Sequence, residues 1–315
     1  MCTACTEDFI PDIDTTPVLC VNSMVKPGEP VIVETTRSWL YTDGQGVDDC
    51  MVDDARVTVY ADDEAVTDDY LPQVGDCIRI VVDSRAYGHA EAEVTVPSPP
   101  SLSSVRWKTE IVSRSVYDSP DGPYTVYVLN LTTEVTVVDD DPQRNYYRFM
   151  YRGFPEPADY ASVSFATGWL DVGNEPIFSE HTGVSDAANG ADLSKYTFFT
   201  DRQFDGGSYT LHLNFEEMEL TVMDDVLTGG LPDIGLELTL SKVSESYYNW
   251  GRYLWAVSES MAGALSEYGL GLPFWGYSNV STGAGVVAAI SGRSCAISLR
   301  DFLLEYGSVL NNPQM

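Results

Sequence analysis

The sequence predicts a mainly β protein with two domains, and three observations lead to this fold class. Short runs rich in β-branched residues recur from residue 18 to 96 and again from 105 to 240, as is typical of strands. Turns containing Gly, Pro and Asp separate these runs. The clearest long helical pattern lies near residues 245–263. We therefore expect an N-terminal immunoglobulin-like or transthyretin-like β-sandwich, followed by a larger antiparallel β-sandwich or barrel-like domain.

The predicted domain boundaries follow changes in composition along the chain. Residues 1–16 are predicted to hold the remnant of a lipobox and an acidic, extended tether. Residues 17–97 carry the strand runs of the first domain. Residues 98–104 are rich in Pro and Ser, which indicates a semi-rigid linker. The larger C-terminal domain takes residues 105–315.

The helix predicted near residues 245–263 has an aromatic face. Tyr247, Leu254 and Met261 have heptad spacing, and neighbouring tyrosine and tryptophan residues widen the apolar face. We expect this helix to pack on the sheet of the second domain. A shorter helical pattern from Ser298 to Tyr306 is expected to close the chain.

The charge of the chain excludes some classes of partner. In 315 residues there are 17 Lys and Arg against 48 Asp and Glu, which gives a formal net charge of −31. Such a field repels nucleic acids and anionic lipids, so we expect neither as a partner. No window approaches the roughly 20 apolar residues that a membrane-spanning helix needs.

The N-terminus resembles the end of a bacterial lipobox. Thr3-Ala4-Cys5 has the two small residues and the cysteine of that motif, although Cys2 stands where the motif has leucine. We predict that Cys5 is lipidated, so that the protein contacts the membrane only through its N-terminal lipid. The alternative that remains open is a frayed N-terminus with two free thiols.

If the chain is cleaved before Cys5, which removes Cys2, and Cys5 carries lipid, four of the six cysteines remain, and an even number in an exported protein permits disulfides. These cysteines are Cys20, Cys50, Cys77 and Cys295. We predict that Cys50 pairs with Cys77, because both lie beside the ends of predicted strands in the same domain. In the chain-entropy model this disulfide would stabilise the fold by roughly 3 kcal/mol.

Several motifs together resemble one protein family. They are Ser246-Tyr247-Tyr248-Asn249-Trp250; Pro273 followed by Tyr277, Ser278, Asn279, Val280, Gly283 and Gly285; Asp139-Asp140-Asp141-Pro142 before Asn145-Tyr146-Tyr147-Arg148-Phe149; and Phe199-Thr200-Asp201 with Phe204-Asp205-Gly206. Their order resembles that of the DUF4249 family of Bacteroidetes lipoproteins, whose function is unknown. The resemblance implies a corner between strands at Gly283 and Gly285, and a location at the outer membrane or cell surface. It also implies association with a TonB-dependent outer-membrane transporter.

The sequence predicts no catalytic residue, no metal ligand and no cofactor site. Gly283 and Gly285 have the spacing of a dinucleotide-binding motif, but the helix and βαβ unit that this motif requires are missing. The adjacent residues Asp139, Asp140 and Asp141 do not form a typical calcium-binding loop, because they lack the alternating ligands of an EF-hand. The aromatic residues exceed what one core needs. The candidates for a binding surface are Tyr146, Tyr147, Tyr151 and Trp169.

We therefore expect a non-catalytic, lipid-anchored binding or accessory subunit at the outer membrane or cell surface. Two alternatives remain open. One is a secreted hydrolase that acts on polysaccharide or peptide through a carboxylate site in the second domain, and the other is a structural adhesin. Two carboxyl groups about 5 to 10 Å apart in a cleft would favour a glycosidase, whereas a flat aromatic patch would favour binding.

Overall fold

The computed structural model describes residues 16–39, 46–154, 163–171, 175–180, 197–223, 233–258 and 276–300. In this part of the chain the protein is mainly β, with several antiparallel sheets, one α-helix and short 3-10 turns, as predicted. None of the described helices is both long enough and apolar enough to cross a membrane.

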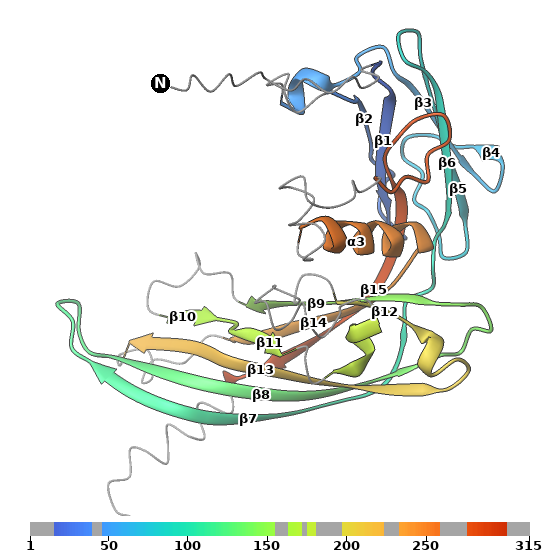
Figure 1. Cartoon of the computed structure of the whole chain (residues 1–315). Coiled ribbons are helices and arrows are strands. Elements are labelled where there is room, and N and C mark those ends of the chain that lie inside the picture. The colour runs from blue at the N-terminus through green and yellow to red at the C-terminus, as the bar shows by residue number, and fades with distance from the viewer. Residues whose placement is uncertain are drawn as a thin grey trace, which may run out of the picture.

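Two β-sandwiches follow one another along most of the chain (Figure 1). The first contains β1 (Leu19–Val25), β2 (Val33–Arg37), the turn η2 (Asp48–Cys50), β3 (Arg56–Ala61), β4 (Glu64–Ala65), β5 (Cys77–Ser84) and β6 (Gly88–Thr95). The remaining elements are β7 (Ser101–Tyr117), β8 (Tyr124–Val138), β9 (Tyr146–Phe154), β10 (Val163–Ala166), β11 (Trp169–Asp171), η3 (Pro176–Glu180), β12 (Phe198–Thr200), η5 (Asp201–Gln203), β13 (Ser208–Met223), β14 (Gly235–Val243), α3 (Glu245–Ser258) and β15 (Val287–Ser298).

The first sandwich closes around alternating side chains. Ile78, Ile80 and Val82 of β5 are completely buried and alternate with less buried residues, as the two-residue period of a strand with one buried face requires. Their sheet has the order β4-β3-β5-β6. It shares a hydrophobic core with Leu19 and Val21 of β1, which lie in the opposing sheet.

One strand, β15, belongs to both sandwiches. Its first residues, Val287, Ala288 and Ala289, pair in parallel with β1. From Ile290 to Ser298 it pairs antiparallel with β14 in the second sandwich. Val287 and Ala289 accordingly lie in the hydrophobic core of the first sandwich. That sandwich is therefore not confined to the predicted residues 17–97, because a strand from the other end of the chain completes it.

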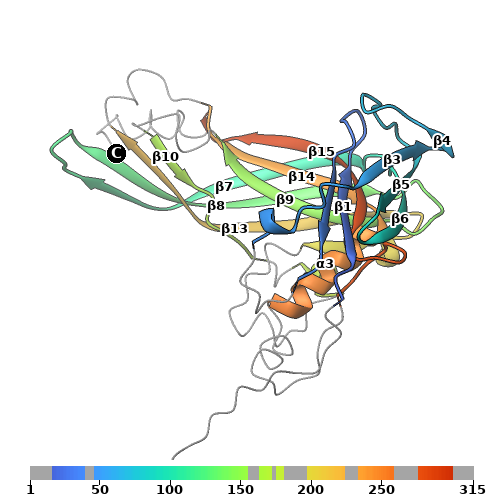
Figure 2. The same cartoon turned by 90° about the horizontal axis from the view of Figure 1, so that it is seen from above.

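The second sandwich consists of two open sheets that pack face to face, so the sandwich alternative holds and the barrel-like one does not. One sheet has the order β12-β9-β14-β15-β1-β2, and the other has β10-β13-β8-β7 with β11 paired to β13. Leu129, Leu213 and Phe215 from one sheet share a core with Phe149 and Leu238 from the other. Figure 2 shows the first sandwich at one end of these long strands.

The connection between the sandwiches is shorter than the predicted linker at residues 98–104. β7 begins at Ser101, which pairs with Val138 of β8. The Ser101 hydroxyl also donates a hydrogen bond to Asp140 Oδ2 at 2.7 Å. Only the residues up to Pro100 therefore act as a connection.

The aromatic helix α3 begins where the sequence predicts it, after a serine cap. The Ser244 hydroxyl accepts a hydrogen bond from the Tyr247 N–H at 3.3 Å. Gly251 lets the helix approach β12 closely, because a Cβ at this position would collide with the ring of Phe198. The part of this predicted helix after Ser258 lies outside the described residues. The predicted C-terminal helix also lies outside them from residue 301 onward.

The glycine corner closes the first sandwich rather than joining two strands of the second domain. Ser281 forms a bridge to β6, and Ala284 forms a bridge to β1, so the segment crosses from one sheet to the other. Gly285 has a φ of +109°. A Cβ at this position would also collide with the backbone carbonyl oxygen of Val21. Glycine is therefore required for both its backbone angle and its close approach to β1.

Substituting Gly285 with Ala is expected to lower the free energy of unfolding by about 3 kcal/mol or more, through strain and collision with β1. Gly28→Ala is the matched control, because Gly28 also has a positive φ, of 77°, but a Cβ at that position would meet no atom within 4 Å. The control should lose only about 1 kcal/mol. Chemical denaturation measures both values, and equal losses would contradict the role assigned to the corner.

Candidate functional site

The family-like motifs of the second domain meet at one end of its sandwich. The Asp139 carboxylate accepts hydrogen bonds from the Asn145 side-chain amide at 3.0 Å and from the Gly206 N–H at 2.8 Å. The Asp201 carboxylate accepts one from the Asn145 N–H at 2.5 Å. Asp139, Asn145 and Asp201 are all buried. N–H donors satisfy the buried carboxylate oxygens of Asp139 and Asp201. We therefore infer that the acidic turn at Asp139 anchors the start of β9.

Tyr147 is the aromatic centre of this end of the core, so its predicted place on a binding surface is wrong. It is completely buried, and its ring stacks on Phe199 with 5.0 Å between centroids. Burial, together with the nearby carboxylates of Asp139 and Asp201, raises the pKa of the Tyr147 phenol far above its ordinary value. The ring therefore contributes packing.

The other three candidate aromatics differ in position. Tyr151 is half-buried, and its ring packs edge-on against Phe215 of the core at 4.9 Å between centroids. Trp169 lies in β11, but the position of its side chain is outside what the structure describes. Tyr146 is half-buried and lines cavities of the protein. Tyr146 is thus the candidate that the structure places at a site.

Asp139, Asn145 and Asp201 form what we call the polar cluster, and Lys242 is a buried cation beside Asp140, which follows Asp139 in the chain. This lysine continues the row of core leucines on β14 and lies opposite Tyr147 in the strand register. Its side chain is only 2% exposed, and its Nζ has no hydrogen-bond partner among the described residues. The nearest carboxylate oxygen in an ion pair is Asp140 Oδ1, at 3.7 Å. The hydrogen bond from Ser101, and then the Lys242 ammonium, hold the pKa of Asp140 below its ordinary value.

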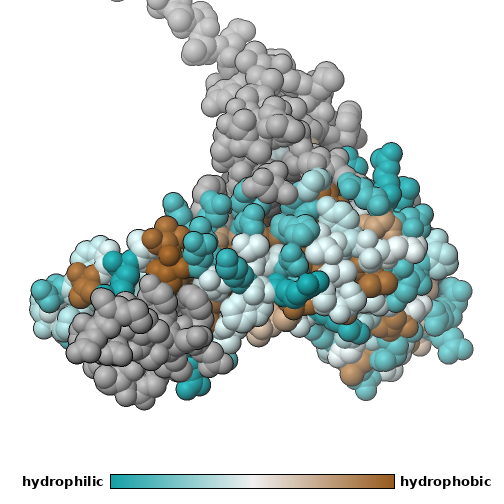
Figure 3. Space-filling view, turned by 90° about the horizontal axis from the view of Figure 1, so that it is seen from below, coloured by the Kyte–Doolittle hydropathy of each residue, from teal (hydrophilic) through white to brown (hydrophobic). Residues whose placement is uncertain are grey.

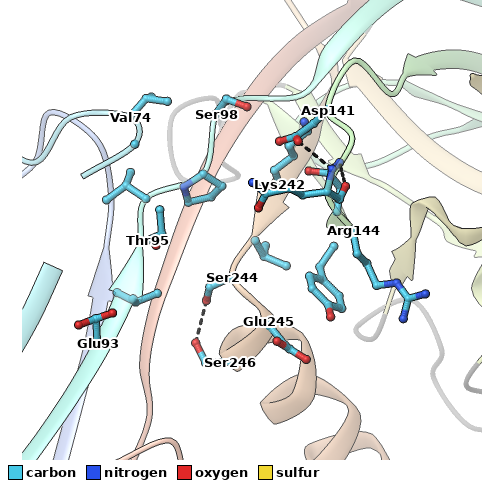
Figure 4. Close-up of a pocket in the computed structure, with 18 of the residues that line it drawn as sticks. Val74, Glu93, Thr95, Ser98, Asp141, Arg144, Lys242, Ser244, Glu245 and Ser246 are labelled. Atoms are coloured by element: carbon cyan, nitrogen blue, oxygen red, sulfur yellow. Dashed lines mark hydrogen bonds between the residues drawn. The ribbon is translucent and has the colours of Figure 1, made fainter. Parts of the chain in front are cut away.

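Lys242 lines a pocket between the two sandwiches, which we call the interdomain pocket; its volume is about 690 Å³. Figure 4 shows Glu93 and Thr95 on one side, and Lys242, Arg144 and Glu245 on the other. The first sandwich contributes Val74, Gly75, Glu93, Val94, Thr95 and Val96, with Pro97 and Ser98 after them; the second contributes Asp141, Gln143, Arg144, Asn145, Tyr146, Lys242, Val243, Ser244, Glu245 and Ser246, with Tyr277 and Asn279. Clefts of this size between domains are common ligand sites.

Hydrogen bonds to β15 hold the second wall of the interdomain pocket in place. The Asn279 amide donates to the Val287 carbonyl at 2.8 Å and accepts from its N–H at 3.0 Å. The Ser244 hydroxyl accepts from the Ala289 N–H at 3.0 Å. Burial raises the pKa of the Tyr277 phenol above its ordinary value, which already lies well above physiological pH, so the phenol is neutral there. The predicted signature residue Asn279 is therefore a structural residue beside the site.

The remaining signature residues also have mainly structural contacts. Tyr247 and Tyr248 pack edge-on against Phe198, with 5.5 and 6.4 Å between ring centroids. The Ser278 hydroxyl accepts a hydrogen bond from the Val280 N–H at 3.1 Å. Pro273 and the predicted lipidation site Cys5 lie outside the described residues.

The predicted disulfide between Cys50 and Cys77 is not formed, since no disulfide joins any of the described cysteines. Cys50 is buried just before Met51, which bridges to β2. Cys77 begins β5 in the opposing sheet of the sandwich. Burial, followed by the hydrogen bond to Glu93, raises the pKa of the Cys77 thiol to about 11. Nearness to strand ends does not predict a disulfide here, because Cys50 lies in the turn η2 and Cys77 begins a strand, and the sequence does not show how far apart the fold places them.

Sequence reasoning missed Lys242 and Arg144 as pocket residues. A sequence signal existed for Lys242, because Leu236, Leu238, Leu240 and Lys242 occupy alternate positions of one strand run. That alternation places the lysine on the buried face. Arg144 carries no such signal, because it lies between motifs in an irregular segment.

Replacing Lys242 with Met tests whether the buried ammonium supports the fold. Asp140 is 60% exposed on its side chain, so water can solvate it once the cation is gone. We expect K242M to be between neutral and about 2 kcal/mol more stable, because the desolvation cost of the ammonium is removed. Leu240→Met is the matched control on the same face, with an expected loss below about 1.5 kcal/mol. A loss of more than about 2 kcal/mol in K242M, measured by chemical denaturation, would assign Lys242 to folding.

Comparison with known proteins identifies the family. No curated protein and no solved structure matches the chain. A family model described as a domain of unknown function, DUF4249, matches residues 6–294, which is nearly the whole chain. The match includes the polar cluster, the residues that line the interdomain pocket, and both sandwiches except the last residues of β15. The chain therefore belongs to the DUF4249 family.

Proposed function

We propose that this protein is a non-catalytic binding or accessory subunit, held at the outer membrane or cell surface by a lipid on Cys5. The interdomain pocket carries the proposal. Its walls come from two sandwiches that share β15, so its shape is built into the fold. Lys242 provides a cation without a hydrogen-bond partner among the described residues, at a site that would be costly to maintain for stability alone.

A second observation supports a protein partner. β7 is 17 residues long and, in the part of the chain that the structure describes, lies at the edge of its sheet, where backbone groups can pair with another strand. Its side chains include exposed hydrophobic ones: Trp107, Val112, Val116 and Tyr117 are 44% to 58% exposed. Figure 3 views the molecule from the side of β7 in Figure 1 and shows brown, hydrophobic residues among pale and teal ones. We propose a TonB-dependent outer-membrane transporter as this partner.

The lipid would provide the contact with the membrane. The net charge of −31 disfavours adsorption of the protein itself on anionic lipid. Thirteen residues, 6–18, separate Cys5 from the start of β1. A fully extended chain of this length reaches at most roughly 45 Å, which sets how far the first sandwich can stand from the bilayer.

The test is palmitate labelling and co-purification in the native host. We expect labelled wild-type protein, unlabelled Cys5→Ala, and full labelling of the control Cys2→Ala.

The wild-type protein, extracted from envelopes in mild detergent, should co-purify with a TonB-dependent transporter. Replacing Val112 and Val116 with Glu should reduce the recovered transporter at least tenfold. Label that persists in Cys5→Ala would contradict the proposed lipidation of Cys5. Wild-type protein that is recovered without a transporter would contradict the proposed partner.

A further inference from the structure

A second cavity adjoins the interdomain pocket and has a different charge. Its volume is about 470 Å³. Its lining consists of Arg144, Tyr146, Thr200, Arg202, Glu245, Tyr248, Asn249 and Arg252, and we call it the arginine pocket. It shares Arg144, Tyr146 and Glu245 with the interdomain pocket, so the two cavities are neighbours.

Three guanidinium groups therefore meet around one cavity in a strongly acidic chain. Arg144, Arg202 and Arg252 have no carboxylate partner in an ion pair among the described residues. Elsewhere in the protein, Arg106 lies 3.7 Å from a carboxylate, and Arg152 also pairs with one. The arginine pocket thus has three cations and one carboxylate, Glu245, in its lining, although the chain as a whole has a net charge of −31.

Rigid parts of the fold hold these arginines in position. Arg144 directly precedes Asn145, and Arg202 directly follows Asp201. The 2.5 Å hydrogen bond from the Asn145 N–H to the Asp201 carboxylate therefore brings the two arginines to the same place. Arg252 comes from α3, next to the glycine that lies against β12. Three separate parts of the sequence are thus fastened around the cavity by buried contacts.

Tyr146 adds a neutral phenol to the arginine pocket. Burial, and next the Glu245 carboxylate, raise the pKa of this phenol above its ordinary value, which already lies well above physiological pH, so the phenol is protonated there. Its ring packs against Tyr248 with 4.7 Å between centroids, which fixes its orientation. A neutral phenol beside guanidinium groups is a hydrogen-bond donor and has an apolar face.

We propose that the arginine pocket binds an oxyanion group, a carboxylate, sulfate or phosphate, that belongs to a small ligand. Guanidinium groups bind such anions through paired N–H donors, and clustered arginines without carboxylate partners are the usual host. The cavity is larger than one oxyanion, so the rest of the ligand extends across Tyr146 into the interdomain pocket. There Lys242 lines the wall. An acidic saccharide has this combination of anionic groups and C–H faces that pack on tyrosine. This inference rests on the proposed binding function and gives it a class of ligand.

Calorimetric titration of the whole purified chain at low ionic strength tests the inference. The probes are sulfate, phosphate, glutarate and tri-galacturonic acid, with neutral galactotriose as the uncharged control. We expect at least one oxyanion probe to bind, and galactotriose to bind at least tenfold more weakly than tri-galacturonic acid. Equal binding of sulfate and the trisaccharide would identify the anionic group alone as what the pocket recognises. Tighter binding of the trisaccharide would show that the sugar rings contribute to the affinity as well.

Two variants locate the site. Changing both Arg202 and Arg252 to Gln should weaken binding of the oxyanion probe at least tenfold and leave the thermal midpoint unchanged, because both side chains are exposed. Arg106→Gln, on β7, is the matched control and should bind as the wild type does. The inference is overturned if no oxyanion probe binds at millimolar concentration, or if the double variant binds as tightly as the control. Because the titration needs neither lipid nor partner, its failure is distinct from failure of the labelling and co-purification test.

Discussion

The sharing of one strand between two sandwiches is the constraint on which the rest of the structure depends. Val287, Ala288 and Ala289 extend the sheet of β1, and the residues from Ile290 onward extend the sheet of β14. A continuous strand cannot bend freely, so the two sandwiches cannot turn independently about a simple linker. The walls of the interdomain pocket, which come from both, are consequently held at a fixed separation. The glycine corner before β15 allows this arrangement, because it lets the chain pass against the backbone of β1.

The polar residues at this junction divide into two groups with different physical roles. Asp139, Asn145 and Asp201 are buried and satisfy one another or nearby N–H groups, so they fix the backbone. The arginines of the arginine pocket, such as Arg202, lack carboxylate partners in ion pairs among the described residues and have exposed side chains, so they are the groups available to a ligand. The Lys242 ammonium is itself buried and adds positive charge beside the interdomain pocket. The family-like motifs supply mostly the first group. Motif recognition therefore identified the scaffold of the site better than it identified the residues that would contact a ligand.

Local patterns in the sequence predicted the local structure well. The β5 run from Cys77 onward and the start of α3 after Ser244 follow from alternation and capping, which depend on neighbouring residues. The pairing of β15 with β1 could not be predicted in this way, because it joins residues such as Ser23 and Val287 that no local pattern relates. The arginine pocket could not be predicted from the sequence for the same reason. Each arginine alone resembles an ordinary exposed residue, and only the fold brings Arg144, Arg202 and Arg252 together.

The measurement that tests the central claim most directly is the unfolding of the first sandwich without β15. Residues 17–97, expressed alone, should show no cooperative urea transition, because their core lacks Val280, Val287 and Ala289. The same fragment joined through a flexible linker to residues 276–290 should recover a single cooperative transition. A fragment 17–97 that unfolds cooperatively on its own, with a stability equal to that of the joined version, would contradict the account of one shared strand that holds the two sandwiches and the pocket between them.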